Sequence, residues 1–319
     1  YTFILYFVAK EVELSVVIPT YNEQENVELI YRKLKQVLER LKKNYELIFV
    51  DDGSADATFQ KIRQLHKFDS RVKGIHFQKN FGKSAAYMAG FKAATGSIIV
   101  TIDADLQDDP EELPRLLDGL KHYSLIIGWK YPRKDPFTKR MTSKVFNMLN
   151  ALFFGLRVHD SDSGYRAMHA AVAKELNLYG DLYRYIPAMV YRRGYSVGEI
   201  KVKHHERKFG RSKYSPKRLL TGMLDLLTVK FLSDFNQRPL HPFGTAGTIS
   251  LFLGFLAELY VLYFKIIVGD LFAKHMPMLI LGVLFIMVGV QLFGIGLIGE
   301  LVTSSNRDVQ RYTIKEFLK

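Results

Sequence analysis

The chain of 319 residues is 48% apolar, so it can bury a complete α/β domain and still have length for further segments. It contains no cysteine, which excludes disulfide bonds and zinc sites built on thiolates. The net charge of +13 indicates an anionic partner, but the basic residues concentrate at 201–238, directly before the first long hydrophobic segment. That position favours anionic lipid headgroups or a phosphorylated substrate over nucleic acid.

The first half of the chain alternates predicted strands and helices. It begins with an apolar segment at 1–10, of unknown role, which lacks the basic start and the cleavage site of a signal peptide. Hydrophobic runs predict strands at 14–19, 45–50, 72–78, 97–102 and 124–128. Amphipathic or helix-favouring stretches between them predict helices at 24–43, up to 68, at 85–94 and at 113–120. This alternation is typical of a doubly wound, mostly parallel sheet.

Carboxylates follow the predicted strand at 97–102 directly. Ligands of open α/β sheets bind at the carboxyl ends of the strands. Asp103, Asp105 and Gln107 offer oxygen ligands for Mg²⁺ or Mn²⁺, which a substrate diphosphate would share. The alternative is a polar loop that caps the next helix, and it describes residues 108–112 better. We therefore predict a metal site at Asp103, Asp105 and Gln107.

Two further loops carry candidate site residues. Lys83 opens a predicted helix, where an anion can bind; the Gly-Lys-Ser sequence is not a P-loop, because Phe77 stands where that motif needs glycine. A polar loop at 159–166 contains Asp160, Asp162 and Arg166, and we predict a site role for it rather than a simple turn.

The last third of the chain has the features of a membrane anchor. Residues 216–235 predict a basic amphipathic helix, either in the plane of the interface or in a core. Two apolar segments, 243–268 and 277–302, exceed the roughly 20 residues that span a bilayer. The distribution of arginine and lysine predicts that both chain ends are cytoplasmic. Glu258 lies mid-span and is expected to face protein, and the glycines of the second segment predict oligomerisation through the spans.

Five motifs occur in order along the chain: Pro-Thr-Tyr-Asn-Glu at 19–23, Asp-Asp-Gly-Ser at 51–54, Asp-Ala-Asp-Leu-Gln at 103–107, Ser-Gly-Tyr-Arg at 163–166, and Arg-Lys-Phe-Gly-Arg-Ser-Lys at 207–213. They resemble the family-2 glycosyltransferases of the GT-A fold, in the polyprenyl-phosphate branch that includes dolichyl-phosphate mannose synthase. The two spans look most like those of bacterial bactoprenol glucosyltransferases of the GtrB type. The resemblance implies a GT-A domain at 11–214, an interfacial helix region at 215–242, two transmembrane helices at 243–302 and a cytoplasmic tail at 303–319.

The resemblance also implies the activity: transfer of a sugar from a nucleotide-sugar to a polyisoprenyl phosphate, with inversion, at the cytoplasmic face of the inner membrane. It implies a nucleotide pocket lined by Pro19, Tyr21 and Glu23, with Asp51 or Asp52 on the base or ribose. We favour UDP-glucose as donor, and GDP-mannose is the alternative. The resemblance further suggests a homotetramer.

The remaining roles follow the same resemblance. Asp103, Asp105 and Gln107 would hold the metal and the donor diphosphate, and Arg133, Arg207 and Lys213 would bind phosphates. The residues themselves add Lys83 to the candidates for the donor site and Arg166 to those for phosphate binding. Asp105, Asp160 and Asp162 are the catalytic candidates. Because the acceptor phosphate is already largely ionised near neutral pH, it needs little help from a base. We therefore expect Asp160 or Asp162 mainly to orient the site, with a base role second.

Two alternatives lead to different proteins. A processive polysaccharide synthase would carry a Gln-x-x-Arg-Trp motif and more spans, whereas the single tryptophan here is Trp129. A membrane scaffold with an inactive transferase domain would not need the complete set of acidic and basic motifs.

Overall fold

The computed structural model describes residues 12–131, 147–148, 150–206, 228–231 and 240–305. The chain divides into two compact units, Tyr1–Lys230 and Phe231–Lys319. We call them the sheet unit and the hairpin unit and describe each by itself.

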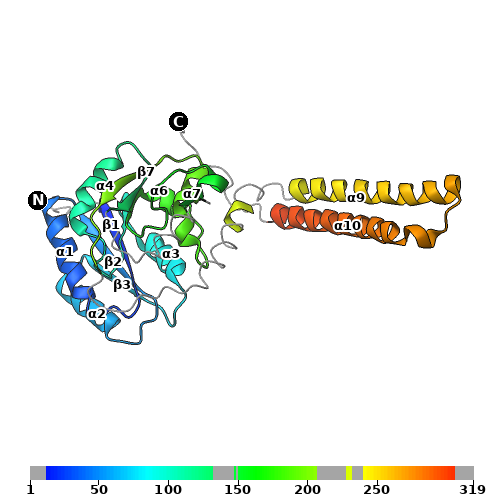
Figure 1. Ribbon diagram of the computed structural model, residues 1–319. Coiled ribbons are helices and arrows are strands. Elements are labelled where there is room, and N and C mark those ends of the chain that lie inside the picture. Colours follow the sequence, from blue (N-terminus) through cyan, green and yellow to red (C-terminus); the bar gives the residue numbers. More distant parts are fainter. Residues whose placement is uncertain (1–11, 132–146, 149, 207–227, 232–239, 306–319) are drawn as a thin grey trace, which may run out of the picture. The chain divides into compact units, whose positions relative to one another are not determined.

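The sheet unit is built on one seven-stranded sheet with the order β3-β2-β1-β4-β6-β5-β7 (Figure 1). Its strands are β1 Leu14–Thr20, β2 Tyr45–Asp51, β3 Val72–His76, β4 Ile98–Thr101, β5 Leu125–Lys130, β6 Arg166–His169 and β7 Val197–Val202. Every pairing is parallel except those of β6, which runs antiparallel to β4 and β5. The carboxyl ends of the other six strands therefore share one edge of the sheet with the start of β6.

Helices cover both faces of the sheet. They are α1 Val27–Arg40, α2 Thr58–Phe68, α3 Lys83–Ala93, α4 Leu113–Gly119, α6 Ala170–Lys174 and α7 Ile186–Arg192, with 3₁₀ turns η1 Pro110–Glu112 and η2 Leu182–Tyr185. Alternate strand residues point to opposite faces, so Val16 packs in the core with α1 and α4 whereas Val17 packs with α3 and α7. Each face thus has its own apolar core.

The predicted mostly parallel sheet is confirmed, and the strands that the prediction missed are β6 and β7. β6 has four residues and begins with a buried arginine, and β7 alternates apolar with polar residues. Neither therefore gives the continuous apolar run of a central parallel strand. Of the predicted amphipathic helix at 216–235, only residues 228–231 lie in the described part, and they are helical.

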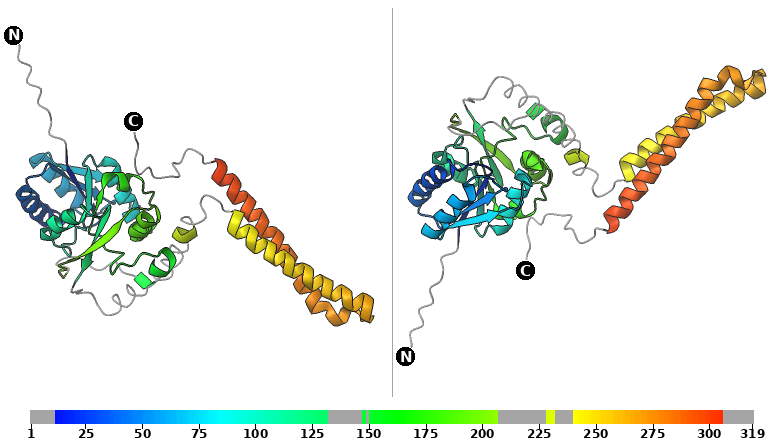
Figure 2. Two further views of the ribbon diagram at one scale, coloured as in Figure 1. Left: turned by 90° about the horizontal axis from the view of Figure 1, so that it is seen from above. Right: turned by 90° about the horizontal axis from the view of Figure 1, so that it is seen from below.

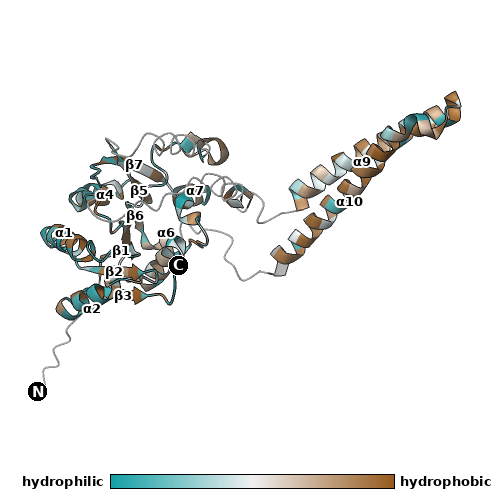
Figure 3. Ribbon diagram, turned by 60° about the horizontal axis from the view of Figure 1, so that its bottom comes forward, coloured by the Kyte–Doolittle hydropathy of each residue, from teal (hydrophilic) through white to brown (hydrophobic). Residues whose placement is uncertain are grey.

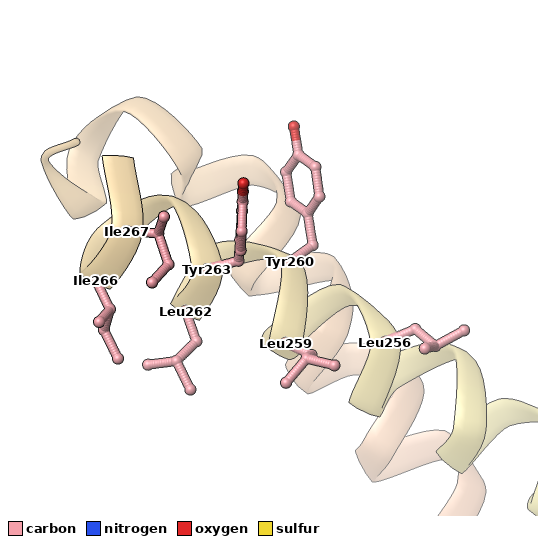
Figure 4. Close-up of a pocket in the computed structure, with 7 residues that line it drawn as sticks. All are labelled: Leu256, Leu259, Tyr260, Leu262, Tyr263, Ile266 and Ile267. Atoms are coloured by element: carbon pink, nitrogen blue, oxygen red, sulfur yellow. The ribbon is translucent and has the colours of Figure 1, made fainter. Parts of the chain in front are cut away.

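The hairpin unit consists of two long antiparallel helices, which lie side by side in every view (Figures 1 and 2). α9 spans Leu240–Tyr263 and continues as the π-helical turn η3 Phe264–Val268; a 3₁₀ turn, η4 Phe272–His275, leads into α10 Met276–Ser305. The segments Leu240–Val268 and Phe272–Val302 are long and apolar enough to cross a membrane. Figure 3 shows α10 coloured largely as apolar, whereas α9 mixes apolar residues with paler and more hydrophilic ones. One outward depression, on α9 and η3, has an entirely apolar and tyrosine lining (Figure 4).

Glycines on α10 explain how closely the two helices pack. Gly282, Gly289 and Gly296 recur every seven residues on the face toward α9. A Cβ on Gly289 would lie 2.6 Å from Cγ of Leu251. The Glu258 carboxyl group lies directly against Gly282, so it faces protein as predicted. These glycines thus have a role within one chain, and the predicted oligomerisation remains a prediction.

Candidate functional site

Lys83 and Asp103 form the central ion pair at the carboxyl edge of the sheet. Lys83 is the first residue of α3 and Asp103 lies just after β4; Lys83 Nζ is 2.6 Å from Asp103 Oδ1 and 2.8 Å from Oδ2. Burial alone would raise the pKa of Asp103, but the ammonium groups of Lys83 and Lys130 outweigh it, so that pKa is lowered. The ammonium group of Lys83 also lies 5.2 Å from the ring centre of Tyr183. The two charges are therefore fixed as a pair.

Gly164 closes one side of this ion pair. A Cβ at this position would lie 2.7 Å from Asp103 Oδ2, which is closer than any side chain tolerates. The backbone of Gly164 cannot move away easily, because its carbonyl accepts a 2.7 Å hydrogen bond from Thr101 Oγ1. The glycine of the Ser-Gly-Tyr-Arg motif is thus required for the position of the Asp103 carboxylate.

A second cation, Lys130, whose side chain is 13% exposed, lies among the other carboxylates. Its Nζ is 3.2 Å from Asp108 Oδ1, and the charges of Asp160, Asp103 and Asp105 act on it as well. Burial alone would lower the pKa of Lys130, but these carboxylates outweigh it and the net pKa is raised. Burial raises the pKa of Asp108 to about 6. The edge thus collects four carboxylates around one lysine.

The loop after β4 is shaped so that its acidic groups converge. Leu106 has φ of +62°, a left-handed conformation that reverses the chain between Asp105 and Gln107. The backbone N–H of Gln107 donates to Asp105 Oδ1 at 3.2 Å, and the backbone carbonyl of Gln107 accepts from the backbone N–H of His205 at 2.8 Å. The segment after β7 therefore holds the acidic loop in place through this backbone hydrogen bond.

The loops after β1 and β2 are locked together. The Asn22 N–H donates to Ser54 Oγ at 2.8 Å, and the Glu23 N–H donates to Thr58 Oγ1 at 2.9 Å. Pro19 and Tyr21 lie beside these contacts and are partly exposed. This partly exposed corner is where the nucleotide pocket was predicted.

Asp51 and Asp52 both bind groups of the protein itself. Asp51 is fully buried and bonds to Ser54 Oγ and to His76 Nδ1, the latter at 2.6 Å. Asp52 accepts from the backbone N–H groups of Phe81 at 2.7 Å and Gly82 at 2.9 Å. Asp52 thereby positions the loop that leads to Lys83, and contact of either residue with a base or ribose remains a prediction.

The two aspartates of the loop before β6, Asp160 and Asp162, lie in different surroundings. Asp160 is 2% exposed, and its Oδ2 accepts from the Lys130 backbone N–H at 3.4 Å, so it belongs to the carboxylate cluster. Asp162 is exposed, and its charge acts on the guanidinium group of Arg184.

The structure corrects the prediction for Arg166. This residue is fully buried and donates to the backbone carbonyls of Tyr183 at 3.1 Å and Ser161 at 3.3 Å. A guanidinium group enclosed in this way ties the loop to η2 and does not face a substrate phosphate. The other predicted phosphate ligands, Arg133, Arg207 and Lys213, lie outside the described residues.

Sequence reasoning missed Lys130, Asp108 and Arg184. Lys130 is the last residue of β5, and in this region only Arg133 was predicted to bind a ligand. Asp108 was assigned to the start of the next helix. The signal that the sequence offered was a lysine close after a predicted strand, at the edge of the sheet where ligands bind.

The donor set fits a divalent cation that a substrate helps to bind. Within the described residues no three acidic or histidine side chains converge as a complete metal cage. Asp105 and Asp103 nevertheless offer carboxylate oxygens on one loop, and Mg²⁺-type ions are commonly held by one or two carboxylates together with substrate phosphates. Asp103 contacts Lys83 with both of its oxygens, and Asp105 accepts the Gln107 backbone N–H with Oδ1.

Comparison with known proteins identifies the family. The family model described as "Glycosyl transferase family 2" matches residues 15–176, a range that runs from β1 through β6 and includes the whole acidic loop. The chain belongs to glycosyl transferase family 2. Its sheet unit has the GT-A fold that the motifs implied, and the transferase resembles polyprenyl-phosphate enzymes over almost its whole length.

Two relatives show this. The transferase is 35% identical over 302 residues to dodecaprenyl-phosphate galacturonate synthase of Rhizobium johnstonii, covering 92% of this chain and 88% of that protein. It is 31% identical over 311 residues to undecaprenyl-phosphate 4-deoxy-4-formamido-L-arabinose transferase of Edwardsiella ictaluri, covering 96% and 94%. Both matches include the hairpin unit, because they cover more than nine tenths of the chain.

Solved structures show the same fold at lower identity. A crystal structure of glucosyl-3-phosphoglycerate synthase from Mycobacterium tuberculosis, in complex with Mn²⁺, UDP and phosphoglyceric acid, superimposes with a TM-score of 0.53 at 17% identity. The match covers 70% of this chain and 78% of that one. The shared feature is the GT-A architecture.

Proposed function

We propose that this transferase moves a sugar from a nucleotide-sugar to the phosphate of a polyisoprenyl phosphate at a membrane surface. The observation that carries the proposal is the charged edge formed by Lys83, Asp103, Asp105 and Lys130 in a chain that also has two helices apolar enough to span a bilayer. Relatives named for dodecaprenyl- and undecaprenyl-phosphate support this acceptor class.

In the proposed reaction an acceptor phosphate oxygen attacks the anomeric carbon of the sugar. The bond from that carbon to the diphosphate breaks, and the nucleoside diphosphate leaves with the electron pair. Asp105, with Asp103 and Gln107, would hold Mg²⁺ or Mn²⁺, which neutralises charge on the leaving diphosphate. Lys83, which contacts Asp103, adds a positive charge beside the diphosphate of the donor.

Asp160 is the residue we propose to orient the acceptor side, because it is buried beside Lys130 whereas Asp162 is exposed. The acceptor phosphate, with a second pKa of about 6, is already a nucleophile near neutral pH. If Asp160 orients, Asp160→Asn retains part of the activity and leaves the pH profile unchanged. If Asp160→Asn abolished turnover with both substrates still bound, and wild-type activity followed a single acidic pKa, a base role would replace the orienting role.

We infer UDP-glucose as the first donor to test. GDP-mannose is the alternative, and the sugars in the relatives' names widen the panel to uronic acid and formamido-arabinose donors. The positive-inside distribution further supports cytoplasmic chain ends, and we propose a homotetramer assembled through the spans.

The test is an incubation of the full-length protein with Mn²⁺ or Mg²⁺, polyprenyl phosphate and each labelled donor. A labelled lipid that is stable to base but cleaved by mild acid is expected with one donor, with inversion at the anomeric carbon. Processive addition of many sugars would indicate a polysaccharide synthase. If no donor gave product while nucleotide still bound, the inactive scaffold would be favoured.

A further inference from the structure

Four side chains beside the acidic edge form a surface cluster that the proposed reaction leaves unused. The His159 imidazole stacks on the Trp129 indole with ring centres 4.0 Å apart and planes 10° apart. The Tyr131 ring lies 5.4 Å from Trp129, and Lys201 Nζ lies 5.0 Å from the centre of the Trp129 ring and 4.8 Å from that of Tyr131. We call Trp129, Tyr131, His159 and Lys201 the tryptophan patch.

The patch faces outward. Tyr131 is 55% exposed and the His159 side chain is 62% exposed, while Lys201 is exposed and Trp129 is half-buried. A stack built only to hold the Asp160 loop would need Trp129 and His159, but not an exposed tyrosine and lysine. The composition therefore calls for an external partner.

The patch also carries a positive charge for which the described residues provide no ion-pair partner. Glu199 accepts from the His159 backbone N–H at 2.7 Å and bonds to His159 Nδ1, so its carboxylate is already engaged. In the described part of the chain Lys201 makes no ion pair; the nearby guanidinium group of Arg115, which bonds to the Lys201 carbonyl at 2.9 Å, pairs with Glu112. An anionic group can therefore approach Lys201 directly.

We infer that the tryptophan patch contacts the phosphate-bearing headgroup layer of a lipid bilayer. Tryptophan and tyrosine are enriched at membrane interfaces, because their rings are apolar with one polar atom, and a lysine there attracts anionic lipid. A domain tethered to two helices of spanning length works next to a bilayer. His159 directly precedes Asp160 in the sequence. Contact of the patch with the bilayer would therefore bring the acidic edge to the membrane surface, where the phosphate of a lipid acceptor lies. The inference does not depend on which sugar is transferred.

Trp129 makes the inference directly measurable, since it is the only tryptophan in the sequence. The full-length protein is reconstituted in vesicles of phosphatidylcholine, with or without phosphatidylglycerol, whose acyl chains are brominated close to the headgroup. Bromine is expected to quench Trp129 emission, more strongly with anionic lipid and less strongly at high salt. A basic residue near an anionic surface contributes about 1 kcal/mol to membrane binding. Lys201→Gln should therefore lower the ratio of protein with the patch on the membrane to protein with the patch in water about fivefold.

Lys92→Gln, an exposed lysine at the far end of α3, is the matched control and should leave the quenching unchanged. Circular dichroism of both variants checks the fold. Trp129 emission that ignores bromine and stays fully open to aqueous iodide would overturn the inference. Equal quenching in Lys201→Gln and wild type would also overturn it. A shift of the emission on adding a nucleotide-sugar in detergent, without any lipid effect, would assign the patch to a soluble substrate instead.

Discussion

Gly164→Ala tests how closely the position of the Asp103 carboxylate is controlled. The added Cβ would lie 2.7 Å from Oδ2 and 2.8 Å from both Cγ and Oδ1 of Asp103, whereas non-bonded heavy atoms prefer about 3.5 Å. The Thr101 hydrogen bond at 2.7 Å holds the Gly164 backbone in place. The carboxylate must therefore move by roughly half an ångström or more, away from a lysine whose nitrogen is now 2.6 Å from it.

The expected result is a loss of activity with little loss of fold. Misplacement of a catalytic group by about 1 Å can cost about 100-fold in rate, so we expect kcat/KM for the donor to fall between about 10-fold and 100-fold. Transfer to polyprenyl phosphate is measured at saturating acceptor, with Mn²⁺ affinity and Tm measured on the same samples. Ser163→Ala is the matched control, because it changes the neighbouring residue and adds no atom near Asp103.

Wild-type kcat/KM and Mn²⁺ affinity in Gly164→Ala would refute the reasoning. That result would mean that the Asp103 carboxylate either tolerates the displacement or has no part in donor binding. A large fall in Tm would instead mean that the glycine is needed for folding, and wild type and Gly164→Ala would then be compared at a temperature where both are folded.

Three further predictions concern other parts of the protein. Hydrogen bonds from Arg71 hold the pKa of Asp69 well below its usual value, so Asp69→Asn should cost about 2 kcal/mol at neutral pH; the deficit should shrink as the pH falls below about 4, in thermal unfolding measured across pH. Asp52→Ala should raise the donor KM more than Asp52→Asn does, because the asparagine keeps one acceptor for the loop before α3; equal KM values would contradict this. Gly289→Leu should lower the Tm of the hairpin unit in detergent, while Gly294→Leu, which points into open space, should not.

The alternation of strands and helices was predictable because buried parallel strands are continuous apolar runs. Residues 45–50, for example, could hardly be read otherwise, and the structure extends that strand only to Asp51. β6 was not predicted because residues distant in the sequence determine its pairing: Arg166 pairs with Thr101, 65 positions earlier. A short strand of this kind is defined by its neighbours and not by its own pattern.

The site was predictable where a motif lies on one strand end and not where it is assembled from several. Asp103 and Asp105 stood out because they follow an apolar run. Lys130 is recognised only when β5 places it beside Asp108, and the burial of Arg166 depends on η2, a segment without a motif. The role of a basic residue within a motif is therefore ambiguous until the fold shows whether it faces a ligand or the core.

The most direct test of the account is whether the loop after β4 binds the donor diphosphate through a divalent cation. Electron paramagnetic resonance of Mn²⁺ is recorded with full-length wild type and Asp105→Asn, each with and without UDP. We predict that UDP strengthens Mn²⁺ binding in the wild type and that Asp105→Asn abolishes this effect at an unchanged Tm. Equal UDP-dependent Mn²⁺ binding in both proteins would contradict the account.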